Sequence, residues 1–267
     1  MVVWLTGGSS GLGKYTAEAI CAAGHRLVVG ARSFQAGRMA NGAYSLPLDV
    51  TKADSVAAYA EQALALAGPP DALVQCAGIL CLGPCEETSA EEYLRIMDTD
   101  FLGMVRMNGA VLPLMREAGS GRIVMFSSIN GLLGIPFQSA YTAAKHAVEG
   151  YAECLQMETA PFGIQVCLVE PGDHRGGSDA YRAHYEAESD DSPYVEEYRK
   201  GIAVIHRDEQ GGSDPAKLGK KVAALLARRR MPGRLRIAKP DQLLAVWLHD
   251  LLPPDLNNRI LRSYYLK

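Results

Sequence analysis

Short apolar runs alternate with longer amphipathic stretches along most of this chain of 267 residues. The apolar runs have the length of buried strands and lie at 2–6, 26–31, 43–48, 72–76, 122–127, 164–170 and 235–237. The amphipathic stretches have the length of helices and lie at 12–23, 52–67, 88–115, 139–159, 215–229 and 241–251. Such alternation favours a parallel sheet with helices on both faces. We predict an α/β fold with a doubly wound parallel sheet, in a single domain spanning 1–267.

Two helix starts carry capping signals. Thr51 is suited to cap the helix that begins at 52, because its hydroxyl can accept a hydrogen bond from a free backbone N–H group. Thr88 or Ser89 is suited to cap the next helix, whose first turn holds Glu91 and Glu92, where the helix dipole favours acids.

The composition is that of a soluble globular protein, with 48% hydrophobic and 21% charged residues. A formal net charge of -3 gives no reason to expect nucleic acid or an anionic membrane as a partner. No apolar run reaches the length of about 18 residues that a membrane span needs. Residues 1–6 have the character of a buried strand rather than a signal peptide, so we predict a cytoplasmic protein whose cysteines are free thiols.

Three of the six cysteines lie close together, at Cys76, Cys81 and Cys85. They lack the paired spacing of a zinc site, and no histidine follows nearby. We therefore predict that the protein holds no metal.

The segment 173–212 differs from the rest of the chain because it is polar, acidic and rich in tyrosine. It follows a predicted strand, and parallel sheets of this kind bind ligands beyond the carboxyl ends of their strands. We predict a lid over a binding site, with a solvated helical pair as the alternative. The side chains that could face a ligand from this lid are Tyr181, His184, Tyr185 and Tyr194.

A glycine-rich turn joins the first predicted strand to the first predicted helix. Glycines at this junction permit a tight turn and let backbone N–H groups approach a pyrophosphate, which the helix N-terminus also stabilises. The turn therefore predicts a dinucleotide site rather than a plain connection. Its predicted cofactor contacts are Thr6, Gly7, Ser9, Ser10, Gly11, Leu12 and Gly13.

The residues after the second strand indicate which dinucleotide binds. An acid there would hydrogen-bond a ribose 2′-hydroxyl, whereas an arginine would pair with a 2′-phosphate. This chain has Arg32 and Ser33 and no acid, so we predict NADP(H) over NAD(H). The alternative for Arg32 is a solvated surface charge.

Tyr141 and Lys145 are four residues apart on a predicted helix, and so they share one face. An ammonium group beside a phenol lowers the pKa of the phenol, because it stabilises the phenolate. The pair is therefore a candidate proton-transfer centre, although the spacing alone also suits an ordinary surface pair.

Together these motifs resemble the short-chain dehydrogenase/reductase family, over residues 2–172 and more weakly to the end. The turn TGGSSGLG is similar to the family's cofactor turn, and Tyr141-x-x-x-Lys145 is similar to its central motif. Ser128 stands where the family has its serine. The segments GLLGIPF and PFGIQV resemble the hydroxysteroid and retinol dehydrogenase branch. The resemblance implies a Rossmann fold and an oxidoreductase that acts on CH–OH groups.

The resemblance also implies roles for these residues. Tyr141 would be the general acid in carbonyl reduction, Lys145 would lower its pKa and hold the nicotinamide ribose, and Ser128 would donate to the substrate oxygen. The carboxylate of Asp49 would meet the adenine. Further implied cofactor contacts are Val50, Cys76, Ala77, Gly78, Pro171 and Gly172.

The chain departs from the family pattern in three places. Asp100 replaces the usual asparagine of the proton relay, so its carboxylate would lie near Lys145 and raise the pKa of Tyr141. Gln75 and Cys76 replace an asparagine pair, which we interpret as a change in sheet stability. Gly176 stands where the family often has a threonine that contacts the nicotinamide amide, and Asp173 or His174 is its possible substitute.

The substrate and assembly are predicted less directly. The apolar segment 131–137, with Cys81, Leu82 and the lid, would line a pocket for a hydrophobic ketone or alcohol such as a hydroxysteroid. Other lipophilic or small carbonyls are alternatives, and so is a catalytically weak NADP(H)-binding sensor or scaffold. The resemblance implies a homodimer or homotetramer paired through 100–117 and 139–159. The apolar residues expected on those faces, unless core packing explains them, are Met104, Met107, Val148 and Met157.

Overall fold

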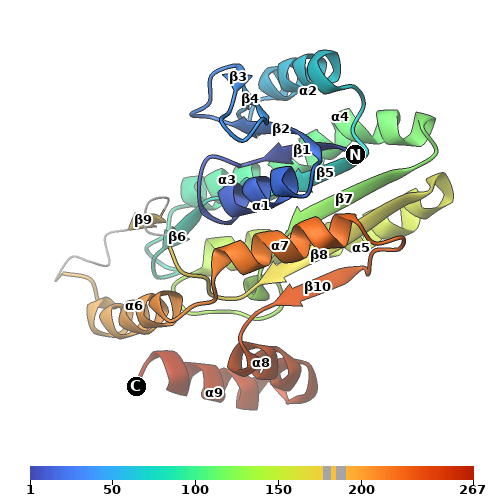
Figure 1. The fold of residues 1–267 in the computed structure, drawn as a ribbon. Helices are drawn as coiled ribbons and strands as arrows, with labels where there is room; N and C mark the ends of the chain where they lie inside the picture. Colours follow the sequence, from blue (N-terminus) through green and yellow to red (C-terminus); the bar gives the residue numbers. More distant parts are fainter. Residues whose placement is uncertain (177–181, 185–190) are drawn as a thin grey trace.

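The computed structural model describes residues 1–176, 182–184 and 191–267, and an extended sheet forms its centre (Figure 1). The sheet has eight strands in the order β10-β8-β7-β5-β1-β2-β4-β3. Every strand in it runs parallel to its neighbours except the short edge strand β3. The doubly wound parallel sheet is therefore confirmed. Its strands are β1 Val2–Thr6, β2 Arg26–Ala31, β3 Gly37–Arg38, β4 Tyr44–Pro47, β5 Ala72–Gln75, β7 Gly121–Phe126, β8 Ile164–Pro171 and β10 Arg234–Ile237.

Helices cover both faces of the sheet and enclose two separate apolar cores. On one face α1 (Gly11–Ala22) packs beside α7 (Pro215–Leu226), and Ile20 and Leu218 belong to the core beneath them. On the other face lie α2 (Ala53–Ala67), α4 (Gly103–Glu117) and α5 (Ser139–Thr159), as Figure 1 shows. This three-layer arrangement leaves the carboxyl ends of the strands open, at the edge where such folds bind ligands.

The long helix predicted over 88–115 is interrupted. It consists of α3 (Ala90–Met97), a π-helical turn at Asp98–Leu102, and then α4. The wider turn shifts the side-chain register, so that Asp100 is fully buried before the apolar face of α4 begins. A π-helical turn often marks a functional site, and an unbroken helical periodicity does not reveal it.

One predicted cap is wrong and another is confirmed. Thr51 does not cap α2, because its N–H and hydroxyl groups both donate to Asp49 Oδ1, at 3.0 and 2.7 Å. Aspartate favours such local bonds to residues two positions later. Ser89 does cap α3, because its hydroxyl accepts a hydrogen bond from the Glu92 N–H group at 3.2 Å.

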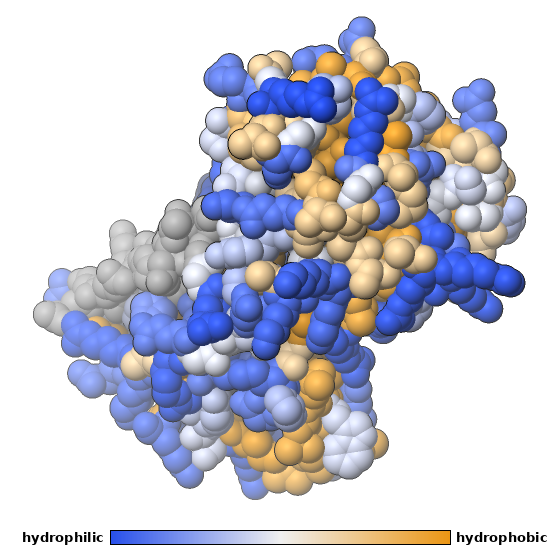
Figure 2. Space-filling model, in the orientation of Figure 1, coloured by the Kyte–Doolittle hydropathy of each residue, from blue (hydrophilic) through white to orange (hydrophobic). Residues whose placement is uncertain are grey.

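The C-terminal region contains a helix that the sequence did not predict. After α8 (Pro240–Leu251), a second helix, α9 (Pro254–Tyr265), begins at a proline and folds back beside it. Proline suits the first helical position, so Pro253-Pro254 marks a helix start rather than the end of the fold. Figure 2 shows an apolar area at its lower end, where Figure 1 places these two helices. Their exposed apolar residues include Leu244, Trp247 and Ile260.

The predicted lid falls partly outside the described residues. Its described part contains the strand β9 (Arg182–His184), which pairs with β6 (Leu80–Leu82), and the helix α6 (Val195–Gln210). Tyr181, Tyr185 and the side chain of His184 lie outside the described residues. The closing movement of this segment stays a prediction.

The faces expected to form an oligomer are mostly core. Met107 and Val148 are fully buried and Met104 is 3% exposed, so only Met157, at 70%, is exposed among these four. Core packing therefore explains the apolar character of the other three, and the oligomeric state stays a prediction. Within the residues that the structure describes, no helix combines the length and apolar character needed to cross a bilayer.

Candidate active site

A cavity of about 670 Å³ lies beyond the carboxyl ends of β1, β5, β7 and β8. Every residue proposed from the sequence as a catalytic or cofactor-binding residue lines it, with the exception of Thr6. The sequence therefore predicted which residues would form the cavity wall.

The glycine turn forms one end of the cavity. Gly7 has a positive φ of 76°, and a Cβ added there would lie 2.5 Å from the Ala77 Cα atom. A Cβ on Gly13 would lie 2.1 Å from the Gly7 carbonyl oxygen. The Ser10 side chain makes no capping hydrogen bond to α1, and the first residues of that helix line the cavity. Glycine is thus required for the close packing, and the turn suits a pyrophosphate.

Thr6 supports this turn from below. Its side chain is 1% exposed, and its hydroxyl accepts a weak hydrogen bond of 3.4 Å from the Ala77 N–H group. Thr6 does not line the cavity, because β1 buries this residue beneath the turn, and its predicted contact with the cofactor stays a prediction. Gln75 is also buried and donates to Asn108 Oδ1 at 2.8 Å, which agrees with a structural role for this departure from the family pattern.

The loops that follow β2 and β4 carry polar groups suited to an adenosine. Asp49 accepts both hydrogen bonds from Thr51, and these bonds lower the pKa of its carboxyl although burial alone would raise it. Arg32 and Ser33 are exposed at the rim of the same cavity. The sequence did not identify Thr51 as a cavity residue, because a threonine just before a predicted helix is equally typical of a helix cap.

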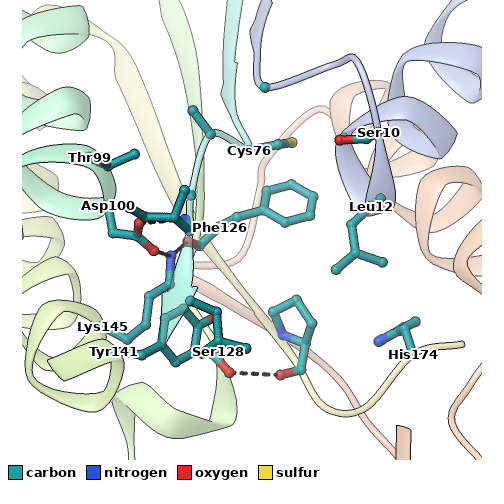
Figure 3. Close-up of a pocket in the computed structure, with 18 of the residues that line it drawn as sticks. Ser10, Leu12, Cys76, Thr99, Asp100, Phe126, Ser128, Tyr141, Lys145 and His174 are labelled. Carbon is teal, nitrogen blue, oxygen red and sulfur yellow. Dashed lines mark hydrogen bonds and ion pairs between the residues drawn. The ribbon is translucent and has the colours of Figure 1, made fainter. Parts of the chain in front are cut away.

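Lys145 and Asp100 form a buried ion pair beside Tyr141 (Figure 3). The Lys145 ammonium lies 3.1 Å from Asp100 Oδ2 and donates to the Phe126 carbonyl at 3.1 Å. Asp100 Oδ1 accepts a bond of 2.7 Å from the Ile79 N–H group. Lys145 and Asp100 are 4% and 0% exposed, so water screens their interaction little.

These charges act on the Tyr141 phenol, whose ring centroid lies 5.3 Å from Lys145 Nζ. Burial raises the pKa of Tyr141, and the Lys145 ammonium opposes this shift. The Asp100 carboxylate raises the pKa of Tyr141 further, as the sequence led us to expect. The same carboxylate raises the pKa of Lys145 above its ordinary value, although burial alone would lower it. Tyr141 is therefore protonated at neutral pH, which suits proton donation.

Ser128 is held by a polar network that the sequence did not indicate. Its hydroxyl has two acceptors within reach, Asn130 Oδ1 at 3.2 Å and the Pro171 carbonyl at 3.5 Å, and it accepts from the Asn130 N–H group at 3.2 Å. Asn130 Nδ2 in turn donates to Gln138 Oε1 at 2.8 Å, and both residues line the cavity. A hydrogen bond from Ser128 also stabilises the Tyr141 phenolate.

The wall opposite the glycine turn is apolar, but its composition differs from the prediction. Cys81, Leu82 and Leu133 are buried in the core and do not line the cavity. The strand β6 alternates its side chains, which explains why Leu80 is a wall residue and its neighbour Cys81 is not. The aliphatic wall residues are Ile79, Leu80, Ile129, Ile135 and Ile205.

Acidic groups from two elements complete this end of the cavity. Asp208 and Glu209 come from α6, and Asp173 comes from the loop after β8. Burial, together with the two neighbouring carboxylates, raises the pKa of Asp173 to about 6. The Glu209 carboxylate also adds to the raised pKa of Tyr141. The end of the cavity that would hold a substrate therefore carries three carboxyl groups beside its aliphatic wall. Of these, Asp208 is paired with Arg207 at 3.0 Å, and Arg175 lines the same cavity.

A sequence profile described as short chain dehydrogenase matches residues 1–184. The chain belongs to the short-chain dehydrogenase/reductase family. This short-chain dehydrogenase/reductase is 36% identical over 264 residues to a 3-ketodihydrosphingosine reductase of Bacteroides thetaiotaomicron, covering 99% of this chain and 97% of the relative. The chain is also 30% identical over 266 residues to dehydrogenase/reductase SDR family member 7B of Xenopus laevis, covering 94% of this chain and 78% of the relative. Neither relative is named for a hydroxysteroid or retinol, so that branch stays a prediction.

Solved structures agree with the fold of this short-chain dehydrogenase/reductase. A short-chain dehydrogenase from Streptomyces avermitilis has a TM-score of 0.79 and 32% identity, over 99% of this chain and 97% of that one. An archaeal alcohol dehydrogenase from Thermococcus sibiricus, complexed with 5-hydroxy-NADP, has a TM-score of 0.71, over 90% of this chain and 96% of that one. Its identity is 23%, so it supports the fold alone.

Family membership makes this protein an oxidoreductase that acts with NAD(P) on alcohol or carbonyl groups. The cavity fits such a cofactor, because Gly7 and Gly13 line it and pack too closely against neighbouring backbone for a Cβ atom, which keeps the turn tight. The N-terminus of α1 faces the same space and favours the negative charge of a pyrophosphate.

Proposed function

We propose that this protein is an NADPH-dependent reductase of a long-chain ketone that carries a protonated amine near its carbonyl group. The observation that carries the proposal is the acidic wall, formed by Asp173, Asp208 and Glu209, in the same cavity as Tyr141. The relative named 3-ketodihydrosphingosine reductase supports it, because a keto-sphingoid is an amino ketone with a long alkyl chain. The proposal replaces the neutral hydroxysteroid expected from sequence, since a steroid offers no cation for these carboxylates.

The chain's own residues would position the carbonyl and supply the proton. Ser128 and Tyr141 would hold the carbonyl oxygen, and the Tyr141 hydroxyl would donate its proton as charge develops there. A reduced nicotinamide, when bound, supplies the hydride. Lys145 would stabilise the phenolate that remains, and the aliphatic wall would exclude water from the acyl chain.

The acidic wall predicts a preference among ketones. Against matched long-chain ketones, the free amine is expected to give a kcat/KM at least about tenfold above the N-acylated or deaminated ketone. In Glu209→Gln this preference is expected to shrink, while Glu196→Gln, at the exposed start of α6, retains it. Initial rates of NADPH oxidation measure both effects. Equal kcat/KM for the amine and its neutral analogues, or for a hydroxysteroid ketone, would contradict the proposed substrate class.

We also propose NADPH as the preferred cofactor, because Arg32 lines the rim beside Ser33 and no acid stands there. Arg32→Ala is expected to weaken NADPH binding by about 10–100-fold, since it removes a charge-assisted contact to the 2′-phosphate. NADH binding is expected to change little. Fluorescence titration measures both affinities, and Arg38→Ala is the matched control because Arg38 lies outside the cavity, against Tyr44. Equal losses for both cofactors would rule out a 2′-phosphate contact.

A further inference from the structure

Gln242, in the first turn of α8, is bonded to the loop that follows β8. Its side-chain amide donates to Asp173 Oδ2 at 2.5 Å. Its side-chain oxygen accepts from the Asp173 N–H group at 3.3 Å and from the Lys239 N–H group at 3.2 Å. One glutamine side chain therefore binds both the backbone and the carboxylate of Asp173.

The loop itself leaves little freedom at this point. A Cβ added at Gly172 would lie 2.1 Å from Gln242 Oε1, so glycine permits the approach of the side chain. The Gly172 N–H group donates to the Ile237 carbonyl at 3.0 Å. On the other side, the Pro171 carbonyl accepts the hydrogen bond from Ser128. The three residues 171–173 thus connect the proposed catalytic serine to α8.

We propose that Gln242 is a positioning residue, which holds the loop 171–173 in the place where the cofactor and the substrate meet. The proposal rests on the proposed function, because it assigns this loop to the nicotinamide end of the cavity. Gln242 acts through Asp173 and Gly172 rather than by touching the reacting atoms. The arrangement gives the C-terminal helices, which lie at the lower end of Figure 1, a part in the active site, although they are far from the glycine turn in sequence.

Several charged groups surround Asp173, so a change in the charge of residue 242 is expected to change how this loop is held. Asp208 and Glu209 face it from α6, Tyr265 faces it from α9, and the cation of Lys239 offsets part of their effect. A glutamate at 242 would place a further carboxylate against Asp173 when both are ionised. At low pH the two carboxyl groups would share a proton, and the hydrogen bond between them would be restored.

The test compares Gln242→Leu, Gln242→Glu and a matched control, Gln156→Leu. Gln156 makes a similar bridge, with Nε2 donating to the Val166 and Gly233 carbonyls at 3.3 and 2.9 Å, but it lies at the opposite end of β8 and outside the cavity. Three quantities are measured: amide exchange at Gly172 and Asp173 without cofactor, NADPH affinity by fluorescence titration, and kcat and KM between pH 5.5 and 8.

Gln242→Leu is expected to speed amide exchange in the loop, and to weaken NADPH binding and lower kcat by about tenfold each. Gln242→Glu is expected to behave alike at pH 8 and to approach the wild type at pH 5.5. Gln156→Leu is expected to lower thermal stability without these changes. Wild-type exchange in Gln242→Leu, or an equal loss of NADPH affinity in Gln156→Leu, would overturn the positioning role. Failure of the proposed function is distinguishable, because the wild type would then turn over no amino ketone, while amide exchange and NADPH affinity still decide the positioning role.

Discussion

Tyr141→Phe is expected to lower kcat for carbonyl reduction by about 10²–10⁴-fold, because it removes the proton donor and little else. Phenylalanine keeps the ring that packs near Lys145, so the fold and the cofactor cavity remain. The proton needed by the developing alkoxide must then come from water, which the aliphatic wall of the cavity excludes. NADPH affinity is expected to stay near that of the wild type.

The measurement is the rate of NADPH oxidation in the presence of a long-chain amino ketone, with cofactor affinity determined separately by fluorescence. Tyr151→Phe is the matched control, since Tyr151 lies on the same helix and its hydroxyl accepts a hydrogen bond from Asn108 outside the cavity. It is expected to retain wild-type kcat. Activity of Tyr141→Phe within a small factor of the wild type would exclude Tyr141 as the proton donor.

Asp100→Asn is expected to shift the pH dependence of alcohol oxidation to lower pH by about one unit. Oxidation requires the phenolate of Tyr141, so its rate rises as pH passes the pKa of that phenol. Asp100 raises this pKa, whereas a neutral asparagine does not. Because the pair is buried and 3.1 Å apart, solvent screens the effect only weakly.

The shift is measured from the acid limb of the pH–rate profile for oxidation of the corresponding amino alcohol. Asp98→Asn is the control, because Asp98 lies in the same π-helical turn but pairs with Arg106 at 2.6 Å, away from the cavity. A second effect has the opposite sign: without Asp100, the pKa of the buried Lys145 falls. If Lys145 lost its proton, the profile would shift upward, and coincident or upward-shifted profiles would contradict our account of Asp100.

Local patterns predicted the sheet well because each parallel strand is a short apolar run bounded by polar turns. The interruption at Asp98–Leu102 could not be predicted in this way, since a π-helical turn changes the register and leaves the apolar spacing on either side intact. The apolar faces of α4 and α5 were similarly ambiguous. Met107 and Val148 look alike whether they face the core or a second subunit, and only the packing against the sheet decides.

The candidate site also contains residues that the sequence predicts and residues that it does not. Ser128, Tyr141 and Lys145 have fixed spacings on one helix and one strand end, so their sequence positions predict a common cavity. The acids of the substrate wall have no such spacing. Asp173 and Glu209 meet only because the loop after β8 and the helix α6 return to the same edge of the sheet. The proposed role of Gln242 could not be predicted from the sequence either, since it depends on the close approach that Gly172 allows.

The most direct measurement of the central claim follows the hydride itself. NADPH carrying deuterium at the transferable position is incubated with the protein and a long-chain amino ketone, and the product is analysed by mass spectrometry. We expect deuterium on the carbinol carbon with the wild type, and almost none with Tyr141→Phe. Saturable binding of NADPH with no deuterium transferred to the amino ketone, or to its N-acylated and deaminated analogues, would contradict the claim and would identify the protein as a binding or sensing member of its family.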